Sequence, residues 1–320
     1  MKHSRLVMTR FITTILFAVS LCFVSSCTSF ESSLEDDLHS SGELQKKERK
    51  TGSASAEGVD VQVYRDRPLE KIVTSVPGRI SNNIGNNPEL FLEDLVRYLT
   101  GDEADPFLQV KNLHDWICDN IAYDAEGYFS GNYSGTDYGS VLRSGKSVCD
   151  GYSGLFLKMA EKAGFQAVKI SGHAKGYGFD PVHKERREST HAWNGVEING
   201  NWYLLDCTWD AGHVTTEGYT KKYSTGYLFL APEYMIFTQH PDQDRWQLLK
   251  TPVSYDDYLD LHFFRGEYFN YLSVDGDGSP EQRNRFVVQQ EAVLKLPKKS
   301  GSFITAVLEG PDMTRYENRA

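Results

Sequence analysis

The chain has 320 residues with a net charge of −10, and 12% of the residues are aromatic. The aromatic content indicates a well-formed core rather than a disordered chain, and the length suffices for one large domain and a smaller one. The excess of negative charge argues against nucleic-acid binding, so we expect no nucleic acid among the partners.

The first residues have the pattern of an export signal. Lys2, Arg5 and Arg10 precede an apolar stretch over residues 11–24. This stretch is shorter than the roughly 20 residues of a membrane-spanning helix, so it favours a signal peptide over a transmembrane anchor. The Val-Ser-Ser-Cys sequence that ends at Cys27 resembles a bacterial lipobox, in which the cysteine is lipidated and becomes the new N-terminus.

The lipobox predicts a lipoprotein signal peptide over residues 1–26, lipidation of Cys27 and a membrane anchor made of acyl chains such as palmitate. Ordinary secretory cleavage near the same place is the alternative. In both cases we expect the protein in the cell envelope, facing the periplasm or the exterior. Thr28 stands where an aspartate is associated with inner-membrane retention in some Gram-negative bacteria, which favours the outer membrane. Residues 27–58, rich in Ser, Glu, Lys and Gly, are predicted to be a flexible tether.

The main domain is predicted over residues 59–250, and two packing helices lie in its first part. Residues 87–101 start with Asn-Pro, typical of a helix N-cap and first position, and end with Gly. Residues 105–121 start with Asp-Pro and carry apolar residues at helical spacing. Residues 122–145 are rich in Gly, Tyr, Ser and Asn and are expected to form an irregular loop.

Cysteine usage points to a free thiol. Two of the five cysteines would leave with the signal peptide or carry the lipid, and the remaining three are odd in number and lack C-x-x-C spacing. We therefore predict neither a disulfide framework nor a metal site, and no cofactor, although a bridge between Cys118 and Cys207 stays open in an oxidising compartment. The natural free thiol is Cys149.

Cys149 is expected at the N-terminus of the next helix. Apolar residues recur at helical spacing from Leu155 to Ala163, and Gly164 then fits a helix C-terminus. Because the positive end of a helix stabilises a thiolate, this position suits a nucleophile.

A β-hairpin is predicted further along the chain. A strand over residues 165–170 and a polar loop over 172–190 come first. Two strands, 191–198 and 202–206, then flank Asn-Gly at positions 199–200, which is a strong signal for a two-residue turn.

Counting residue pairs outward from that turn places Trp193 opposite Asp206. His191 then lies diagonally from Asp206 on the same sheet face, within reach of it. A slip of one residue would move one of them to the other face.

Together these residues predict a nucleophilic triad. The Cys149 thiolate would attack a carbonyl carbon, His191 would act as its base and ion-pair partner, and Asp206 would orient the imidazole. The backbone N–H of Cys149 is the first expected oxyanion donor, and the second stays unassigned. Taken singly, each residue would more often be structural. The other histidines considered, at positions 114, 173 and 183, are interpreted as packing or surface residues.

The residues around this triad resemble the core of the transglutaminase-like superfamily, and are most similar to its kyphoscoliosis peptidase branch and bacterial relatives. The resemblance covers roughly residues 106–249. It implies an α+β fold with a papain-like order of helix and then antiparallel sheet, and the same roles for Cys149, His191 and Asp206. The matching phrases are Asp115-Trp116-Ile117, Val148-Cys149-Asp150-Gly151-Tyr152-Ser153, His191-Ala192-Trp193-Asn194 and Trp202-Tyr203-Leu204-Leu205-Asp206-Cys207-Thr208-Trp209.

Two positions depart from the family pattern. Lys146 stands where the family tends to have glycine, and Asp210 where Trp-Gly-Ala-Gly is usual. The first departure alters the approach to the nucleophile, and the second alters a turn behind the aspartate.

These observations predict an exported thiol enzyme that acts on peptide or isopeptide amide bonds through a thioester acyl-enzyme, with peptidase-like hydrolysis favoured. A protein-crosslinking transglutaminase and a non-catalytic scaffold or adhesion module are the alternatives. The expected partners are a protein or peptide substrate, with cell-wall peptide as a candidate, and a membrane through the lipid anchor. Residues 251–320 are predicted to form a small β-rich module, with 255–269 irregular and strands over 286–296 and 303–308.

Overall fold

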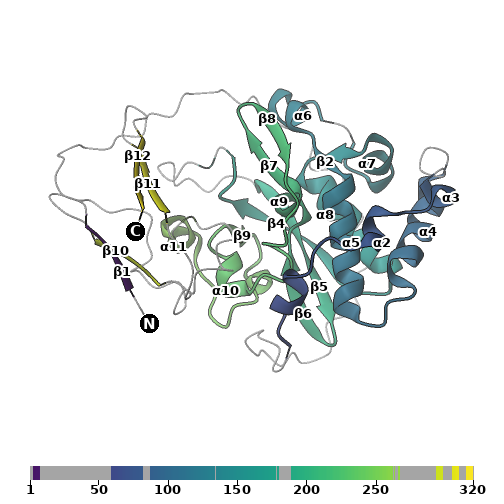
Figure 1. Cartoon of the computed structure of the whole chain (residues 1–320), viewed down its shortest axis with the longest axis horizontal. Helices are drawn as coiled ribbons and strands as arrows, with labels where there is room; N and C mark the ends of the chain where they lie inside the picture. The colour runs from purple at the N-terminus through teal and green to yellow at the C-terminus, as the bar shows by residue number, and fades with distance from the viewer. Residues whose placement is uncertain are drawn as a thin grey trace.

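The structure is a computed structural model that describes residues 3–7, 59–81, 87–133, 135–177, 179, 189–261, 263, 266, 293–297, 305–309 and 315–319. Helices pack on one face of a four-stranded antiparallel sheet, and shorter elements cover the other face (Figure 1). The helices are α1 (Gln62–Arg65), α2 (Lys71–Thr74), α3 (Gly78–Ser81), α4 (Pro88–Thr100), α5 (Pro106–Asn120), α6 (Ala125–Ser130), α7 (Tyr138–Ser144), α8 (Cys149–Lys162), α9 (Cys207–Ala211), α10 (Pro232–Met235), η2 (Asp244–Gln247) and α11 (Tyr255–Asp260).

The central sheet has the strand order β6-β5-β4-β9, and all neighbouring strands in it are antiparallel. Two small pairs flank it: β2 with β3, which is parallel, and β7 with β8. These strands are β2 (Ala122–Tyr123), β3 (Lys146–Ser147), β4 (Ala167–Ala174), β5 (His191–Ile198), β6 (Asn201–Leu205), β7 (Gly212–Thr215), β8 (Gly218–Lys221) and β9 (Gln239–Pro241).

The two predicted packing helices are confirmed, with their predicted caps. The Asn87 side chain accepts a hydrogen bond from the Leu90 N–H at the start of α4, and the Asp105 side chain accepts one from the Phe107 N–H at the start of α5. Each cap satisfies a backbone donor that the first helical turn leaves without a partner.

The prediction of an irregular loop over residues 122–145 is wrong, because this segment contains α6 and α7. Asp124 caps α6 and Asp137 caps α7, each through its side chain. Both helices end at a glycine in the left-handed region, Gly131 at φ 68° and Gly145 at φ 66°. An Asp at the N-terminus and a Gly at the C-terminus satisfy the free backbone groups of these short helices. Their apolar periodicity is too brief to detect in the sequence.

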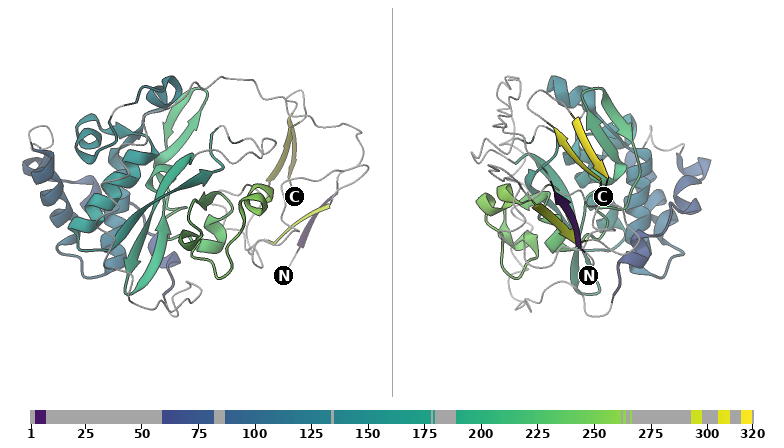
Figure 2. Two further views of the ribbon diagram at one scale, coloured as in Figure 1. Left: turned by 180° about the vertical axis from the view of Figure 1, so that it is seen from behind. Right: turned by 60° about the vertical axis from the view of Figure 1, so that its left-hand side comes forward.

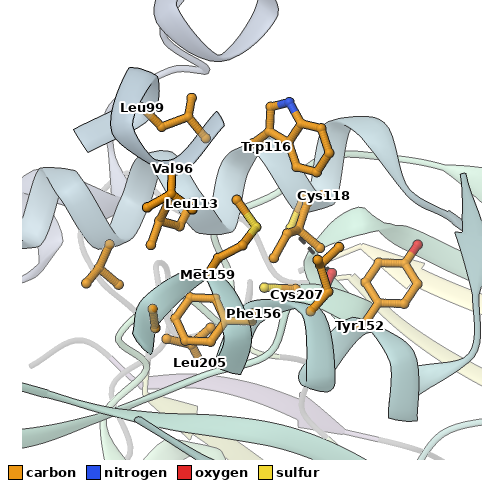
Figure 3. Close-up of a cluster of buried hydrophobic side chains, with 14 of the residues drawn as sticks. Val96, Leu99, Leu113, Trp116, Cys118, Tyr152, Phe156, Met159, Leu205 and Cys207 are labelled. Carbon is orange, nitrogen blue, oxygen red and sulfur yellow. Dashed lines mark hydrogen bonds between the residues drawn. The ribbon is translucent and has the colours of Figure 1, made fainter. Parts of the chain in front are cut away.

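Helix α8 begins at Cys149, as predicted, and lies between the other helices and the sheet. Phe156 and Met159 from α8 lie between Leu113 of α5 and Leu205 of β6 (Figure 3). Gly164, with φ 90°, follows the C-cap residue of the helix. Because α8 is held on both sides, its N-terminal end has a fixed place beside β4 and β5.

The hairpin of β5 and β6 has the predicted turn and register. Asn199 and Gly200 both have positive φ, 52° and 82°, and Ile198 pairs with Asn201 as counted from the sequence. Positive φ at both central residues is typical of the turn that matches the twist of paired strands. The second strand ends at Leu205, one residue earlier than predicted, because the next residue caps α9.

A second apolar cluster covers the face of the sheet that lies away from α8. Alternate residues divide between the two faces: Val196 and Ile198 pack toward the helices, and Trp193 packs into the second cluster. Ile170 of β4 and Leu204 of β6 also belong to the second cluster, and its other buried members come from the chain after β8, including α10 and η2. Figure 2 shows the sheet enclosed between the helical layer and this segment.

The C-terminal region differs from its prediction in one described element. Tyr255–Asp260 is the helix α11, capped by the Ser254 side chain, rather than irregular chain. The strands β10 (Val293–Pro297) and β11 (Thr305–Glu309) overlap the predicted strands; β11 pairs with β12 (Arg315–Arg319), and β10 with β1 (His3–Val7). The β-rich module as a separate domain stays a prediction.

The predicted tether, residues 27–58, lies outside the described residues, as does most of the predicted signal peptide. Among the helices that the structure describes, none combines the length and apolarity needed to cross a bilayer.

Gly172 on β4 lies where the backbone of β9 approaches the sheet closely. A Cβ added at Gly172 would lie 2.7 Å from the Pro241 Cα and closer still to the His240 carbonyl oxygen. We predict that Gly172→Ala lowers the free energy of unfolding in urea by about 1–3 kcal/mol, because backbone rather than a flexible side chain must move. Gly195→Ala on β5 is the control, since its nearest atoms are side chains at 3.2 Å or more. Equal losses in the two variants would contradict the prediction.

Candidate active site

Cys149 is the first residue of α8 and is half-buried. The N-cap residue Val148 is extended and offers no side-chain cap to the first turn. Gly151 lets this turn pack closely, since a Cβ there would lie 2.8 Å from the Val141 side chain and closer still to Ser147. The sulfur therefore lies at the positive end of a 14-residue helix whose first turn is tightly held.

His191 and Asp206 are brought together at the end of the hairpin. His191 Nε2 lies 2.6 Å from Asp206 Oδ2, and both residues are buried. Since Nε2 is occupied by the carboxylate, Nδ1 is the ring nitrogen left for another partner. Hydrogen-bonding and electrostatic interactions also connect His191 with Cys149. The three predicted residues thus form one continuous chain of contacts.

Asp206 is held by two further donors. It is the N-cap of α9, and its Oδ1 accepts a hydrogen bond of 3.1 Å from the Trp209 N–H. Gln239 Nε2 on β9 donates to Oδ2 at 2.6 Å. Sequence reasoning missed Gln239, since it lies 33 residues beyond Asp206 on a three-residue strand and no sequence pattern marks it.

Two tryptophans flank the imidazole of His191. The ring of Trp193 lies 6.0 Å away at an interplanar angle of 21°, and the ring of Trp209 lies 5.7 Å away at 45°. They limit access of water to the His191–Asp206 pair, which strengthens its electrostatic interaction.

The pKa of His191 reflects this environment. Burial alone lowers it, but the Asp206 carboxylate, followed by Cys149, outweighs burial and raises the pKa of His191 to about 10. The ring therefore carries a proton at neutral pH.

A second buried polar network lies behind α9. His114 Nδ1 is 2.9 Å from Asp115, and its Nε2 is 3.1 Å from Asp210. Lys111 pairs with the other oxygen of Asp115, and the Tyr227 N–H donates to Asp210 at 2.9 Å. Two cations thus face two carboxylates, all fully buried. His114 is therefore an ionic partner of Asp210 in this network rather than a packing residue.

The remaining predicted positions lie elsewhere. His173 is buried, with its ring 4.7 Å from that of Tyr255, and His183 is outside the described residues. Lys146, one of the two departures from the family pattern, pairs with Asp124 at 3.0 Å.

One cluster has the residue types of a metal site. His114, Cys118 and Cys207 are buried, with their ligand atoms within 4.8 Å of one another. Both His114 nitrogens already contact carboxylates, and Cys118 Sγ lies 3.3 Å from the Cys207 carbonyl oxygen. His114 and Cys118 thus have partners within the protein. Cys118, Cys149 and Cys207 are all free thiols.

Comparison with known proteins identifies a matching family model and several similar proteins. The model of the family described as the transglutaminase-like superfamily matches residues 93–207. Kyphoscoliosis peptidase of Mus musculus is 31% identical over 221 residues, 68% of this chain and 33% of that protein. Hillarin of Drosophila melanogaster is 26% identical over 223 residues, 66% of this chain and 26% of that protein. A crystal structure of a TGase is 19% identical with a TM-score of 0.31, over 48% of this chain and 42% of that one.

The fold is α+β and transglutaminase-like, with helices packed on an antiparallel sheet, as predicted. The chain spans about a third or less of the length of the two curated relatives named above.

The buried histidines make stability depend on pH. Burial lowers the pKa of His114, but Cys207, followed by the Asp115 and Asp210 carboxylates, outweighs burial and raises it to about 10; the pKa of His191 is also about 10. Both exceed the ordinary value of 6.5, so their contribution is complete below pH 6.5 and is lost as pH rises toward 10. We predict that the free energy of unfolding falls between pH 7 and 9.

Urea unfolding across that range checks the prediction. His114→Gln removes one of the two titrating histidines. The free energy of unfolding should then change less steeply with pH, even though the variant is less stable at every pH. Thr100→Val is the control, since it removes a buried hydrogen bond but no titratable group, and it should leave the slope unchanged. A slope that His114→Gln does not alter would contradict the assignment.

Proposed function

We propose that this chain is a thiol enzyme that acts on peptide or isopeptide amide bonds, with Cys149 as nucleophile, His191 as acid and base, and Asp206 as the orienting group. The observation that carries the proposal is the chain of contacts from the half-buried sulfur at the start of α8, through one imidazole, to a buried carboxylate. The similarity to the transglutaminase-like superfamily and to a protein named a peptidase supports it.

The proposed reaction begins with the ion pair. The Cys149 sulfur, as thiolate beside protonated His191, forms a bond to the amide carbon, and the carbonyl electrons move to oxygen. The Cys149 N–H at the helix N-terminus donates to this oxyanion. His191 then gives its proton to the amine, the C–N bond breaks, and a thioester remains. A water molecule attacks the thioester while His191 takes its proton, and the acid and the thiolate are released.

Asp206 supports both proton transfers without itself changing charge. It holds Nε2, so that Nδ1 is directed to the reacting groups, and it stabilises the imidazolium. Gln239 and the Trp209 N–H hold the carboxylate in turn, so its orientation does not depend on the histidine.

Hydrolysis is the favoured outcome, and amine transfer is the alternative. A lysine amine in place of water would give an isopeptide crosslink from the same thioester. A non-catalytic scaffold is the rival from another class. The buried carboxylate with three donors favours the enzyme, because a scaffold has no need to hold an imidazole beside a thiol.

The proposal also places the enzyme at the cell envelope. The lipobox before Cys27 supports a lipid anchor, the outer membrane is favoured, and the tether would hold the enzyme away from the bilayer. Protein or peptide substrates, including peptides of the cell wall, are within reach of such an anchor.

Peptide cleavage and amine incorporation separate the two reactions. Mass spectrometry of a glutamine-bearing protein incubated with the enzyme and a labelled primary amine would report both. We predict cleavage that exceeds amine incorporation, and a loss of at least about 1,000-fold in Cys149→Ala and His191→Ala. Amine incorporation as the main Cys149-dependent reaction would overturn the preference for hydrolysis. If neither cleavage nor amine incorporation is detected, and Cys149 is alkylated no faster than a model thiol, the result would favour the scaffold.

Gln239 is predicted to position Asp206. Gln239→Leu removes one donor from Oδ2, and we expect kcat to fall about tenfold, or about 1.4 kcal/mol, with KM unchanged. Gln247→Leu is the matched control, since Gln247 is equally buried but bonds the backbone of Val253. An equal loss of kcat in both variants would mean that Gln239 acts through stability alone.

A further inference from the structure

We propose that the surface beside Cys149 is a subsite that binds an aromatic or large apolar side chain of the substrate, next to the amide under attack. This inference rests on the proposed function and names its substrate class. The subsite is an aromatic platform formed by Tyr123, Tyr128, Phe129 and Tyr177.

The platform is built from three separate parts of the chain. Tyr123 lies on β2, Tyr128 and Phe129 lie on α6, and Tyr177 lies in the segment after β4. Successive ring centroids are 5.9 Å apart for Tyr123 and Tyr128, 5.6 Å for Tyr128 and Phe129, and 5.1 Å for Phe129 and Tyr177. The rings therefore form one continuous surface rather than scattered exposed residues.

Most of this surface is open to solvent. Tyr128 is 43% exposed, Phe129 46% and Tyr177 49%. Single exposed aromatic residues need no explanation, but here Phe129 contacts both of the other two rings, so a contiguous apolar area is left uncovered. Burying such an area against a ligand yields about 25 cal/mol per Å².

The inner end of the platform adjoins the nucleophile. In the parallel pairing of β2 and β3, Tyr123 is opposite Ser147, two residues before Cys149. The pKa of Tyr128 is raised by burial and then by negative charge at Cys149 and Tyr177. Burial and then Cys149 likewise raise the pKa of Tyr123. Both tyrosines thus lie within electrostatic range of the sulfur.

The outer end of the platform, at Tyr177, lies near the residues that surround His191. Gly176, which precedes Tyr177, lies against Trp209, since a Cβ there would be 3.3 Å from the indole. Trp209 in turn flanks the His191 ring. The platform therefore adjoins the candidate site at both ends, through Ser147 near Cys149 and through Trp209 beside His191.

Charge and dimensions favour an apolar side chain in this place. Next to Tyr123 in sequence, the Asp124 carboxylate is paired with the Lys146 ammonium at 3.0 Å. An extended peptide advances about 3.4 Å per residue, so the side chain one or two positions from the attacked amide falls beside Cys149. Aromatic and aliphatic side chains both stack favourably on such rings.

The test compares two small alkylating reagents, 2-chloroacetamide and N-benzyl-2-chloroacetamide. Their rates at Cys149 are measured by mass spectrometry of the peptide that contains it, and the ratio of benzyl to parent rate is compared with the ratio for N-acetylcysteine. We expect the ratio at Cys149 to exceed that of N-acetylcysteine about tenfold. In Phe129→Ser and Tyr177→Ser the ratio should fall at least threefold.

Leu90→Ser is the control. Leu90 is 41% exposed and belongs to α4, which lies near the C-terminal end of α8, far from Cys149. Its neighbour Glu89 contacts Lys162, the last residue of the helix, about 20 Å along the helix axis from Cys149. This variant should keep the wild-type ratio.

The two proposals fail in different ways. A benzyl-to-parent ratio equal to that of N-acetylcysteine in the wild type, or unchanged in both platform variants, overturns the subsite whatever the reactivity of Cys149. Alkylation by 2-chloroacetamide no faster than for N-acetylcysteine counts against the proposed nucleophile, while the ratio still reports on the platform.

Discussion

The Asp206 carboxylate is the point on which the candidate site depends. One side chain caps α9, accepts from Gln239 on β9 and bonds His191 on β5, so it joins three elements that are distant in sequence. A buried carboxylate without such donors would be costly, and with them it is held in one orientation. The position of the imidazole, and through it the environment of Cys149, follows from this arrangement.

The second ionic network fixes the same helix from behind. Asp210 lies one turn after Asp206 on α9 and binds His114 on α5 and the backbone N–H of Tyr227. Two buried carboxylates, one capping α9 and one within it, thus face different partners. Asp210, one of the two departures from the expected family pattern, thus forms an ion pair with α5.

The parts of the fold that could be predicted were those with strong local signals. Asn-Pro and Asp-Pro marked the starts of α4 and α5, and Asn-Gly set the turn and register of β5 and β6. Helices α6, α7 and α11 were missed, since each has at most seven residues and is stabilised by a side-chain cap and by packing rather than by a long apolar stripe.

The sequence by itself determined which residues could form the site and where each lies on its own element. Cys149 opens a helix and His191 lies at the base of a hairpin, because capping and turn preferences act over a few neighbouring residues. Only the tertiary structure decided what surrounds them. Gln239, the His114–Asp210 pair and the aromatic platform come from segments far apart in the chain, and their contacts arise from packing, which leaves no periodic pattern in the sequence.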